Sequence, residues 1–299
     1  MARIFVTGGT GFVGKAVVRA LQAHGFVVRC LVRPGSEPDL RGFEAIERVP
    51  GDVLMPHGLA DSIEGCAAVI HLVGIIREHP AVGVTFERMH AAATANMVEV
   101  ARAAGVRRYL QMSALGTRPN ARSRYHRTKW EAEETVRQSD LQWTVFRPSV
   151  IYGPGDGFVT MLARLVRRLP VVPVIGTGAY RLQPVAVEQV AEAFARALTR
   201  DATIGQTYEV GGPRAYPFTE ILDLIGAALG KQKVRKVYQP LGIMRPLVAC
   251  LERLPFFPLT SDQLRMLEEN NVCDPEPFFT TFELKPIEFP DGLGQMFQR

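Results

Sequence analysis

The sequence of 299 residues has little of what marks several protein classes. Its four cysteines are widely separated, in neither a paired nor a metal-ligand spacing. They are Cys30, Cys66, Cys250 and Cys273. The six histidines show no metal-ligand spacing with cysteine or carboxylate, and no G-x-S-x-G nucleophile elbow occurs. We therefore expect a protein of a reducing compartment, with no metal site and no serine-hydrolase chemistry.

Long apolar runs and runs of one charge are also missing. The most apolar late stretch, 241–259, is interrupted by Arg245, Glu252 and several prolines, which argues against a spanning helix. The N-terminus enters an apolar strand after Met-Ala-Arg, unlike a signal peptide. The net charge of +5 is spread along the chain, so it suits a phosphorylated cofactor or an anionic membrane surface better than nucleic acid. We expect a cytoplasmic protein, with peripheral contact at the inner face of the membrane as the alternative.

What the sequence does contain is a regular alternation of apolar strands and amphipathic helices. Strands are predicted at 4–6, 27–32, 45–49, 67–73, 107–112 and 143–146, with helices at 12–24, 85–104 and around Tyr125. Such strands favour a parallel sheet covered on both faces, so residues 1–150 are predicted to form a doubly wound, Rossmann-type α/β domain. Prolines and glycines after Arg147 indicate a smaller α+β substrate lobe over 151–183 and 206–299, while 184–205 packs back on the first domain.

A glycine-rich turn lies between the first predicted strand and the first predicted helix. It reads T-G-G-T-G-F-V-G and satisfies both G-x-G-x-x-G and G-x-x-G-x-x-G. Glycines permit a tight turn and a close backbone approach, so that the amides at the helix N-terminus can meet a pyrophosphate. The predicted contacts here are Gly8, Gly9, Thr10, Gly11, Phe12, Val13 and Gly14.

The end of the second strand bears on the choice between NADP and NAD. An NAD site would place an acid there to bind the ribose hydroxyls, but this sequence has Arg33, whose guanidinium suits a 2′-phosphate. We therefore predict NADP(H), with NAD as the alternative because Glu37 and Asp39 are nearby. Asp52 and Val53 are predicted to border the adenine. Further cofactor contacts are expected at Val73, Gly74, Pro148 and Val150.

Tyr125 and Lys129 stand four positions apart in the segment R-Y-H-R-T-K-W-E-A-E-E. This spacing places both side chains on one helix face, and Ser113 ends a parallel strand where open α/β sheets bind ligands. The three residues form a proton-transfer set: Ser113 would bind the substrate oxygen, Tyr125 would exchange its proton and Lys129 would bind the nicotinamide ribose. A neighbouring ammonium and the cofactor cation are expected to favour the phenolate and lower the tyrosine pKa. On spacing alone, Tyr-x-x-x-Lys recurs by chance, and a solvated helix face is the favoured explanation of the pair.

These motifs, together with R-P-S-V-I-Y-G-P-G at 147–155, resemble the short-chain dehydrogenase/reductase superfamily in its extended or atypical, epimerase/dehydratase-like branch. Segments 89–96, 183–190, 208–213 and 259–264 are most similar to the branch that contains the NAD(P)-binding accessory subunit of respiratory complex I and its bacterial relatives. The resemblance implies the roles given above for Ser113, Tyr125 and Lys129. His90 stands where many sugar-epimerase relatives carry asparagine, which makes a nucleotide-sugar substrate less favoured.

Three functions remain open from the sequence. The first is an oxidoreductase that transfers hydride between NADP(H) and a carbonyl or carbinol of an apolar or quinone-like small molecule. The second is a cofactor-loaded binding module in contact with a respiratory complex or a membrane, and the third is a nucleotide-sugar epimerase or dehydratase. The apolar segment 241–254 is predicted to be a helix buried in the core of the small lobe, with docking as the alternative. The sequence makes no prediction of oligomeric state.

Overall fold

A parallel sheet forms the centre of the larger domain in the computed structural model, which describes residues 1–36, 40, 42–43, 45–252, 254, 257 and 259–297. Among these residues the sheet has seven strands, in the order β11-β6-β5-β4-β1-β2-β3. They are β1 Arg3–Thr7, β2 Val27–Val32, β3 Ile46–Pro50, β4 Ala68–His71, β5 Arg108–Met112, β6 Gln142–Pro148 and β11 Gln206–Val210. The strand order reverses between β1 and β4, so the loops at their carboxyl ends diverge and leave room for a ligand there.

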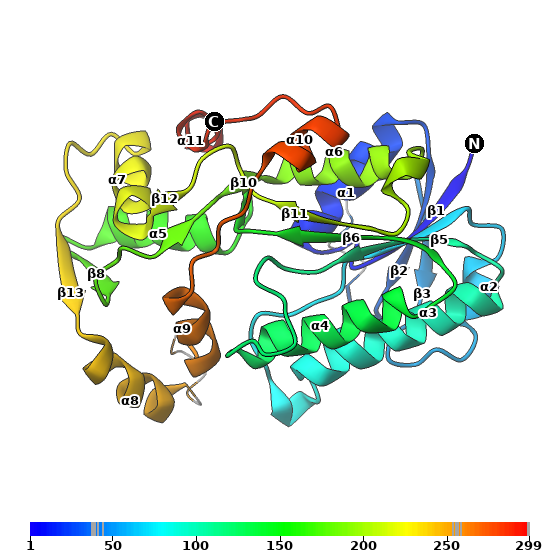
Figure 1. Cartoon of the computed structure of the whole chain (residues 1–299), viewed down its shortest axis with the longest axis horizontal. Coiled ribbons are helices and arrows are strands. Elements are labelled where there is room, and N and C mark those ends of the chain that lie inside the picture. Colours follow the sequence, from blue (N-terminus) through cyan, green and yellow to red (C-terminus); the bar gives the residue numbers. More distant parts are fainter. Residues whose placement is uncertain are drawn as a thin grey trace.

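Helices cover both faces of this sheet (Figure 1). One face carries α1 Phe12–Ala23, α6 Val187–Ala197 and α10 Glu276–Thr281; the other carries α2 Leu59–Ile63, α3 Ala93–Ala103 and α4 Arg124–Arg137. A π-helical segment, η3 Glu87–Ala92, precedes α3. Two separate apolar cores follow from this layering, because strand side chains alternate between the faces. The predicted doubly wound α/β fold is confirmed.

One strand of the sheet comes from a segment that the sequence analysis placed in the small lobe. Strand β11 pairs in parallel with β6, from Gln206 beside Thr144 to Val210 beside Pro148. Phe278 of α10 is fully buried in the core on this side of the sheet. Residues 206–210 therefore extend the large sheet, and the lobe boundary at 206 is wrong at this point. The pairing was missed because its partner strand β6 lies far earlier in the chain, so no local sequence pattern records the contact.

The smaller lobe is built from short strand pairs and three helices around one core. Its helices are α5 Phe158–Arg168, α7 Phe218–Ala228 and α11 Phe289–Phe297. The strand pairs are β8 Val172–Ile175 with β13 Lys236–Gln239, β9 Arg181–Leu182 with β12 Tyr216–Pro217, and β7 Ile151–Tyr152 with β10 Val185–Ala186. In the larger domain, single 3-10 turns occur at η2 Pro80–Val82 after β4 and at η4 Asp201–Thr203 before β11. The tail after Asn270, which the sequence pattern left without structure, forms α10 and α11.

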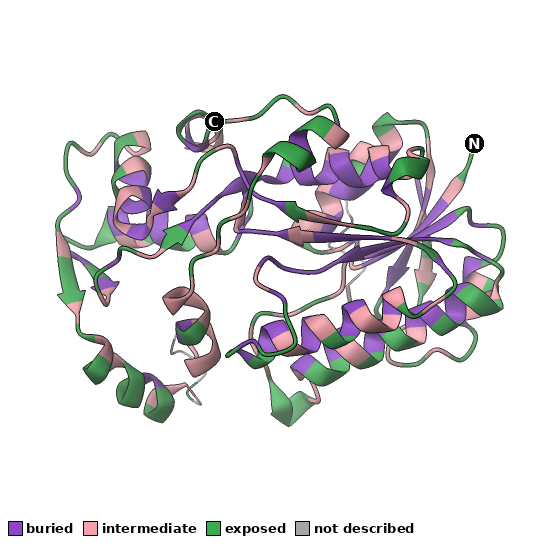
Figure 2. Cartoon of the chain, viewed as in Figure 1, coloured by how far each residue is buried: buried purple, intermediate pink, exposed green. Residues whose placement is uncertain are grey.

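Two further helices, α8 Leu241–Leu251 and α9 Ser261–Glu268, leave the lobe at its strand β13 (Figure 1). Figure 2 shows α8 as largely exposed, and Val248 is its one buried residue. Ile243 is 62% exposed and Leu247 is 43% exposed. The prediction that segment 241–254 is buried in the lobe core is therefore wrong. The lobe core is closed by α5, α7 and α11, and among the described residues α8 lies mainly against α9, with its Leu241 beside Gly176 after β8. No helix among the described residues is long and apolar enough to cross a membrane.

Candidate active site

The glycine turn brings the N-terminus of α1 to the carboxyl edge of the sheet. Gly8 has a φ of +75°, in the left-handed region that favours glycine, and the amide of Gly11 donates to the carbonyl of Gly8 at 3.1 Å. A Cβ atom on Gly14 would lie 2.1 Å from the Gly8 carbonyl oxygen. Helix α1 also has no acidic residue in its first turn. The turn therefore exposes a helix N-terminus that fits a pyrophosphate, and any side chain at position 14 would push the helix away from it.

The other predicted cofactor contacts follow the neighbouring strands at the same edge. Arg33 directly follows β2 and is exposed, and Asp52 follows β3. The Asp52 carboxylate accepts a hydrogen bond from the amide of Leu54 at 2.9 Å, which fixes this loop. Asn96 of α3 donates to the carbonyl of Val53 at 2.8 Å, which ties the same loop to α3. Asn96 was missed in the sequence, although it belongs to the segment 89–96 that carries the family resemblance.

Gly74, a predicted cofactor contact, lies in the loop that follows strand β4. A Cβ atom on Gly74 would lie 2.8 Å from the Nζ atom of Lys129 and 3.6 Å from the Nε2 atom of His90. Glycine at this position therefore leaves space for the lysine ammonium beside the loop that follows β4. The half-buried Val73 precedes it.

Tyr125 and Lys129 both point into the protein from α4. Tyr125 is 9% exposed and Lys129 is 3% exposed. The Lys129 ammonium donates to the carbonyl of Met112 at 3.2 Å, and Ser113 follows directly. Ala114, the next residue, packs in one apolar cluster with Tyr125. The structure thus places Ser113 between two residues that contact Lys129 and Tyr125, so the solvated-face explanation of the pair is wrong.

Hydrogen bonds to β6 hold the Ser113 segment. The amide of Ser113 donates to the carbonyl of Phe146 at 2.7 Å, and the amide of Leu115 donates to that of Pro148 at 2.8 Å. The Ser113 hydroxyl is 3.4 Å from the Thr117 hydroxyl, and Ser113 is 3% exposed. Val150, two residues beyond Pro148, packs against the core of the small lobe. Pro148 therefore lies beside the serine, whereas Val150 belongs to the junction with the lobe.

Aromatic rings enclose the ring of Tyr125. The rings of His90 and Phe86 have centroids 5.3 and 5.8 Å from it, both in edge-to-face arrangements. The His90 Nδ1 atom lies 2.9 Å from the Thr128 hydroxyl, which itself donates to the carbonyls of Arg124 and Tyr125. The His90 Nε2 atom lies 3.1 Å from both the amide nitrogen and the carbonyl oxygen of Ile75, so it accepts from the first or donates to the second according to the tautomer. His90 connects α4 to the loop after β4, a positioning role that its sequence position alone did not reveal.

Burial controls the protonation of this cluster. It raises the pKa of Tyr125 to about 12 and lowers the pKa of Lys129 to about 8, an effect that Glu133 partly opposes. Burial and the nearby Lys129 charge lower the pKa of His90 to about 2 and that of His71 to about 3. In the protein itself, desolvation of the phenolate moves the Tyr125 pKa upward, so any lowering depends on the cofactor cation as well as on Lys129. At neutral pH Tyr125 is a phenol that can donate a proton.

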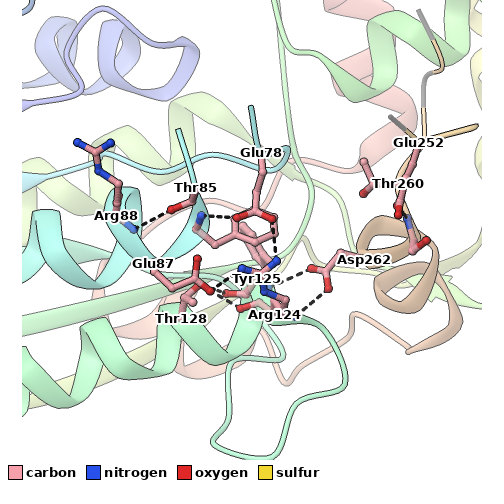
Figure 3. A network of polar contacts seen from close by, with 12 residues as sticks. Glu78, Thr85, Glu87, Arg88, Arg124, Tyr125, Thr128, Glu252, Thr260 and Asp262 are labelled. Carbon is pink, nitrogen blue, oxygen red and sulfur yellow. Dashed lines mark hydrogen bonds and ion pairs between the residues drawn. The ribbon is translucent and has the colours of Figure 1, made fainter. Parts of the chain in front are cut away.

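Helix α9 covers this cluster from the side of the small lobe. Its Met266 packs against the group formed by Phe86, Ala114 and Tyr125. The Asp262 carboxylate accepts hydrogen bonds from the amides of Arg124 and Tyr125 at 2.7 and 3.0 Å, as Figure 3 shows. The free amides at the start of α4 are thereby satisfied by a side chain from α9. The sequence carried a signal for α9, since Thr260 and Gln263 form a capping box at its start.

One ion pair, from Arg118 to Glu269, joins the end of α9 to the larger domain, and Arg124 beside Asp262 is held by pairs within that domain. Arg124 pairs with Glu78 at 3.0 Å and with Glu87 at 2.7 Å, and Arg118 pairs with Glu269 at 2.8 Å. On the lobe side of α9 lies a pocket of about 470 Å³. Its lining mixes polar and apolar groups and consists of Arg122, Ile175, Gly176, Thr177, Ala179, Tyr180, Leu241, Leu264, Leu267, Glu268 and Asn270. The pocket thus adjoins the loop before α4 without including Tyr125.

Comparison with known proteins identifies the family. A profile of the NAD dependent epimerase/dehydratase family matches residues 4–211. Ceramide reductase from Caulobacter vibrioides is 35% identical over 222 residues, which cover 73% of this chain and 68% of that protein. NADH dehydrogenase [ubiquinone] 1 alpha subcomplex subunit 9 from Arabidopsis thaliana is 30% identical over 94% of this chain and 71% of its own length. This chain therefore belongs to the NAD dependent epimerase/dehydratase family.

Solved structures agree on the fold. The dTDP-glucose 4,6-dehydratase from Bacillus anthracis, in complex with NAD, superposes with a TM-score of 0.75 over 100% of this chain and 96% of that chain, at 17% identity. At that identity the likeness concerns the fold alone. The family membership and the relatives together make this an NAD(P)-binding protein of an oxidoreductase family that includes reductases and complex I subunits.

Proposed function

We propose that this protein is an NADP(H)-dependent oxidoreductase that transfers hydride between the cofactor and a carbonyl or carbinol of an apolar small molecule. The observation that carries the proposal is the placement of a buried tyrosine and a buried lysine around the strand end that bears Ser113. A charged side chain is desolvated at a cost, so a buried lysine held by one carbonyl beside a glycine indicates a functional site.

The chain's own groups account for the proton and the orientation of the substrate. The bound nicotinamide would supply or accept the hydride. In the reducing direction Tyr125 donates its phenolic proton to the carbonyl oxygen, for which its neutral form at pH 7 is suited. Ser113 donates a hydrogen bond to the same oxygen and fixes the carbonyl. Lys129 binds the nicotinamide ribose and stabilises the phenolate that is left on Tyr125.

The glycine turn, Asp52, Val53, Val73 and Gly74 are proposed to hold the dinucleotide. Arg33 is proposed to select NADP(H), because it is exposed directly after β2, where its guanidinium can contact a 2′-phosphate. NAD remains the alternative, and the identity of the nucleotide that copurifies with the protein decides between them.

An apolar substrate suits the surroundings of Tyr125. The ring is bordered by Phe86, Ala114, Ile75 and Met266, which form one apolar cluster with it. A relative that is named a ceramide reductase agrees with a lipid-like carbonyl compound. A polar nucleotide sugar would have to replace these contacts with hydrogen bonds, so the epimerase alternative is less favoured.

The direct test is NADPH consumption with a panel of ketones of increasing apolar area and with quinones. Wild-type protein is expected to turn over the apolar members, and the Tyr125→Phe variant is expected to bind NADPH but to reduce them poorly. Wild-type turnover that survives unchanged in the Tyr125→Phe variant would rule out the assigned proton donor.

A second function is favoured by one observation. The Arabidopsis relative, a subunit of NADH dehydrogenase, matches 94% of this chain, including both lobes. Under this alternative the protein is a cofactor-loaded module that contacts a respiratory complex, and NADP(H) stabilises its fold. Full NADPH affinity with no turnover of any carbonyl or quinone substrate, together with copurification of respiratory-complex subunits, would support it.

A further inference from the structure

Helix α8 is apolar on both of its faces. The side facing the protein presents Leu241, Met244, Val248 and Leu251. The opposite side presents Ile243, Pro246, Leu247 and Cys250, all exposed and spaced as one helix face. A helix with two apolar faces is normally covered on both, yet here the second face meets solvent. This outer face needs a partner of low polarity.

The chain around α8 carries one sign of charge. Between Asp223 and Glu252 the sequence has no acidic residue and five basic ones, namely Lys231, Lys233, Arg235, Lys236 and Arg245. Lys236 is paired with Asp223 and Arg245 with Glu268, whereas Lys233 and Arg235 are exposed beside β13. Strand β13 also exposes Val237 (44%) and Tyr238 (53%). Basic and apolar side chains thus alternate on the segment that leads into α8.

We propose that the outer face of α8, together with β13, docks on an anionic phospholipid surface. Ile243, Pro246 and Leu247 would enter the boundary between headgroups and acyl chains, while Lys233 and Arg235 would meet the phosphate groups. At about 16 Å, an 11-residue helix is too short to span a bilayer, so it lies in the interface plane. A second copy of this chain fits less well, because a two-fold contact would bring these uncompensated basic residues together.

Docking is independent of the proposed chemistry but has a consequence for it. Leu241, at the start of α8, lines the pocket of about 470 Å³ that adjoins the loop before α4. The helix that meets the lipid therefore also borders this pocket, whose lining includes Leu264 and Leu267 of α9. A lipid-like molecule that leaves the bilayer beside α8 would meet this pocket first.

The test is cosedimentation of the full-length protein with vesicles of phosphatidylcholine alone and of phosphatidylcholine mixed with phosphatidylglycerol. Wild-type protein is expected to bind the mixed vesicles, and high salt is expected to weaken this binding because the phosphate contacts are exposed. The double variant Ile243→Asp/Leu247→Asp should bind at least roughly tenfold more weakly, since two apolar insertions are lost. A double variant Lys233→Gln/Arg235→Gln should lose most of the preference for phosphatidylglycerol.

Met55→Asp is the matched control, because Met55 is 71% exposed between β3 and α2 of the larger domain. It should bind vesicles as wild type does, and melting temperatures should show that every variant is folded. Milder changes, Ile243→Ser with Leu247→Ser, provide a second set if the aspartates disturb the fold. Wild-type protein that stays in the supernatant with both vesicles overturns the proposal. An aspartate variant that turns a wild-type dimer into a monomer by light scattering would instead assign the face to a second copy.

Discussion

Helix α4 is rich in charged residues and buries seven of its side chains, whereas α8 has one charged residue and buries one. Helix α4 lies between α3, the sheet and α9, so most of its faces have a neighbour. Helix α8 leaves the small lobe after β13, and α9 is its main neighbour among the helices that the structure describes. The position of a helix in the fold, and not its mean polarity, therefore decides how much of it is buried.

The charges of α4 are tolerated because each buried one has a partner. Glu133 is fully buried and accepts hydrogen bonds from Arg147 of β6 at 2.9 and 2.6 Å, as well as from Arg137. Lys129 has only the Met112 carbonyl at hydrogen-bond distance, which is why burial lowers its pKa. Removing a partner from such a group is costly, whereas changing an exposed apolar residue of α8 is not.

The largest expected effect lies on α4. Tyr125→Phe removes the proposed proton donor but keeps the ring, so turnover should fall by about 10²–10⁴. NADPH affinity and melting temperature should stay close to those of wild type. Tyr208→Phe, on the partly exposed side of β11, is the matched control and should leave turnover unchanged. Steady-state kinetics on an apolar ketone gives the measurement, and equal losses in both variants would contradict the assignment.

The next effect concerns the same edge of the sheet, at β2. Arg33→Ala should weaken NADPH binding by roughly 1.5–3 kcal/mol, because it removes a charged contact with the 2′-phosphate. NADH binding should be nearly unchanged, since NADH lacks that phosphate. Fluorescence titration of both nucleotides provides the dissociation constants. If Arg33→Ala weakens NADH as much as NADPH, the arginine does not select the phosphate.

The buried charge of α4 should be visible in stability without cofactor. Because burial lowers the Lys129 pKa to about 8, the folded state is penalised by this charge at pH 7, and Lys129→Met should raise the free energy of unfolding by about 1–3 kcal/mol. Above pH 8 the folded lysine loses its proton while the unfolded one keeps it until about 10.5, so the wild type gains stability. The advantage of the variant should shrink between these two values. Urea unfolding at a series of pH values measures it.

Exposed Lys285 supplies the control for this experiment. Lys285→Met should change the free energy of unfolding by less than about 0.5 kcal/mol at every pH. An advantage of Lys129→Met that stays constant up to pH 10.5 would show that packing, rather than charge, is its cause.

The smallest effect is expected on α8. Leu247→Asp should change the free energy of unfolding by less than about 0.5 kcal/mol, because the side chain is already 43% exposed and its outer face has no neighbour among the described residues. Val248→Asp, one position along the helix and fully buried, should destabilise by more than about 2 kcal/mol. Thermal melts of both variants measure the difference. Similar losses would mean that the outer face is covered in the folded protein.

Local patterns in the sequence were sufficient to predict the doubly wound fold of the N-terminal domain. The glycine turn, the apolar strands and the spacing of Tyr125 and Lys129 depend on residues within a few positions of each other, and they predicted the doubly wound domain and one shared helix face. The family resemblance rested on the same segments. Strand ends of a parallel sheet meet at one edge by geometry, so the predicted cofactor residues also followed from strand order.

Contacts between distant segments were decided only by the tertiary structure. Strand β11 joins the large sheet because it finds β6 as a neighbour, and Asp262 caps α4 from 137 positions further along the chain. The pKa of Tyr125 depends on how many groups surround it, which no local pattern records. Segment 241–251 has the composition of a core helix, but burial requires a second surface. The core of the small lobe is formed by α5, α7 and α11, and α8 lies outside it.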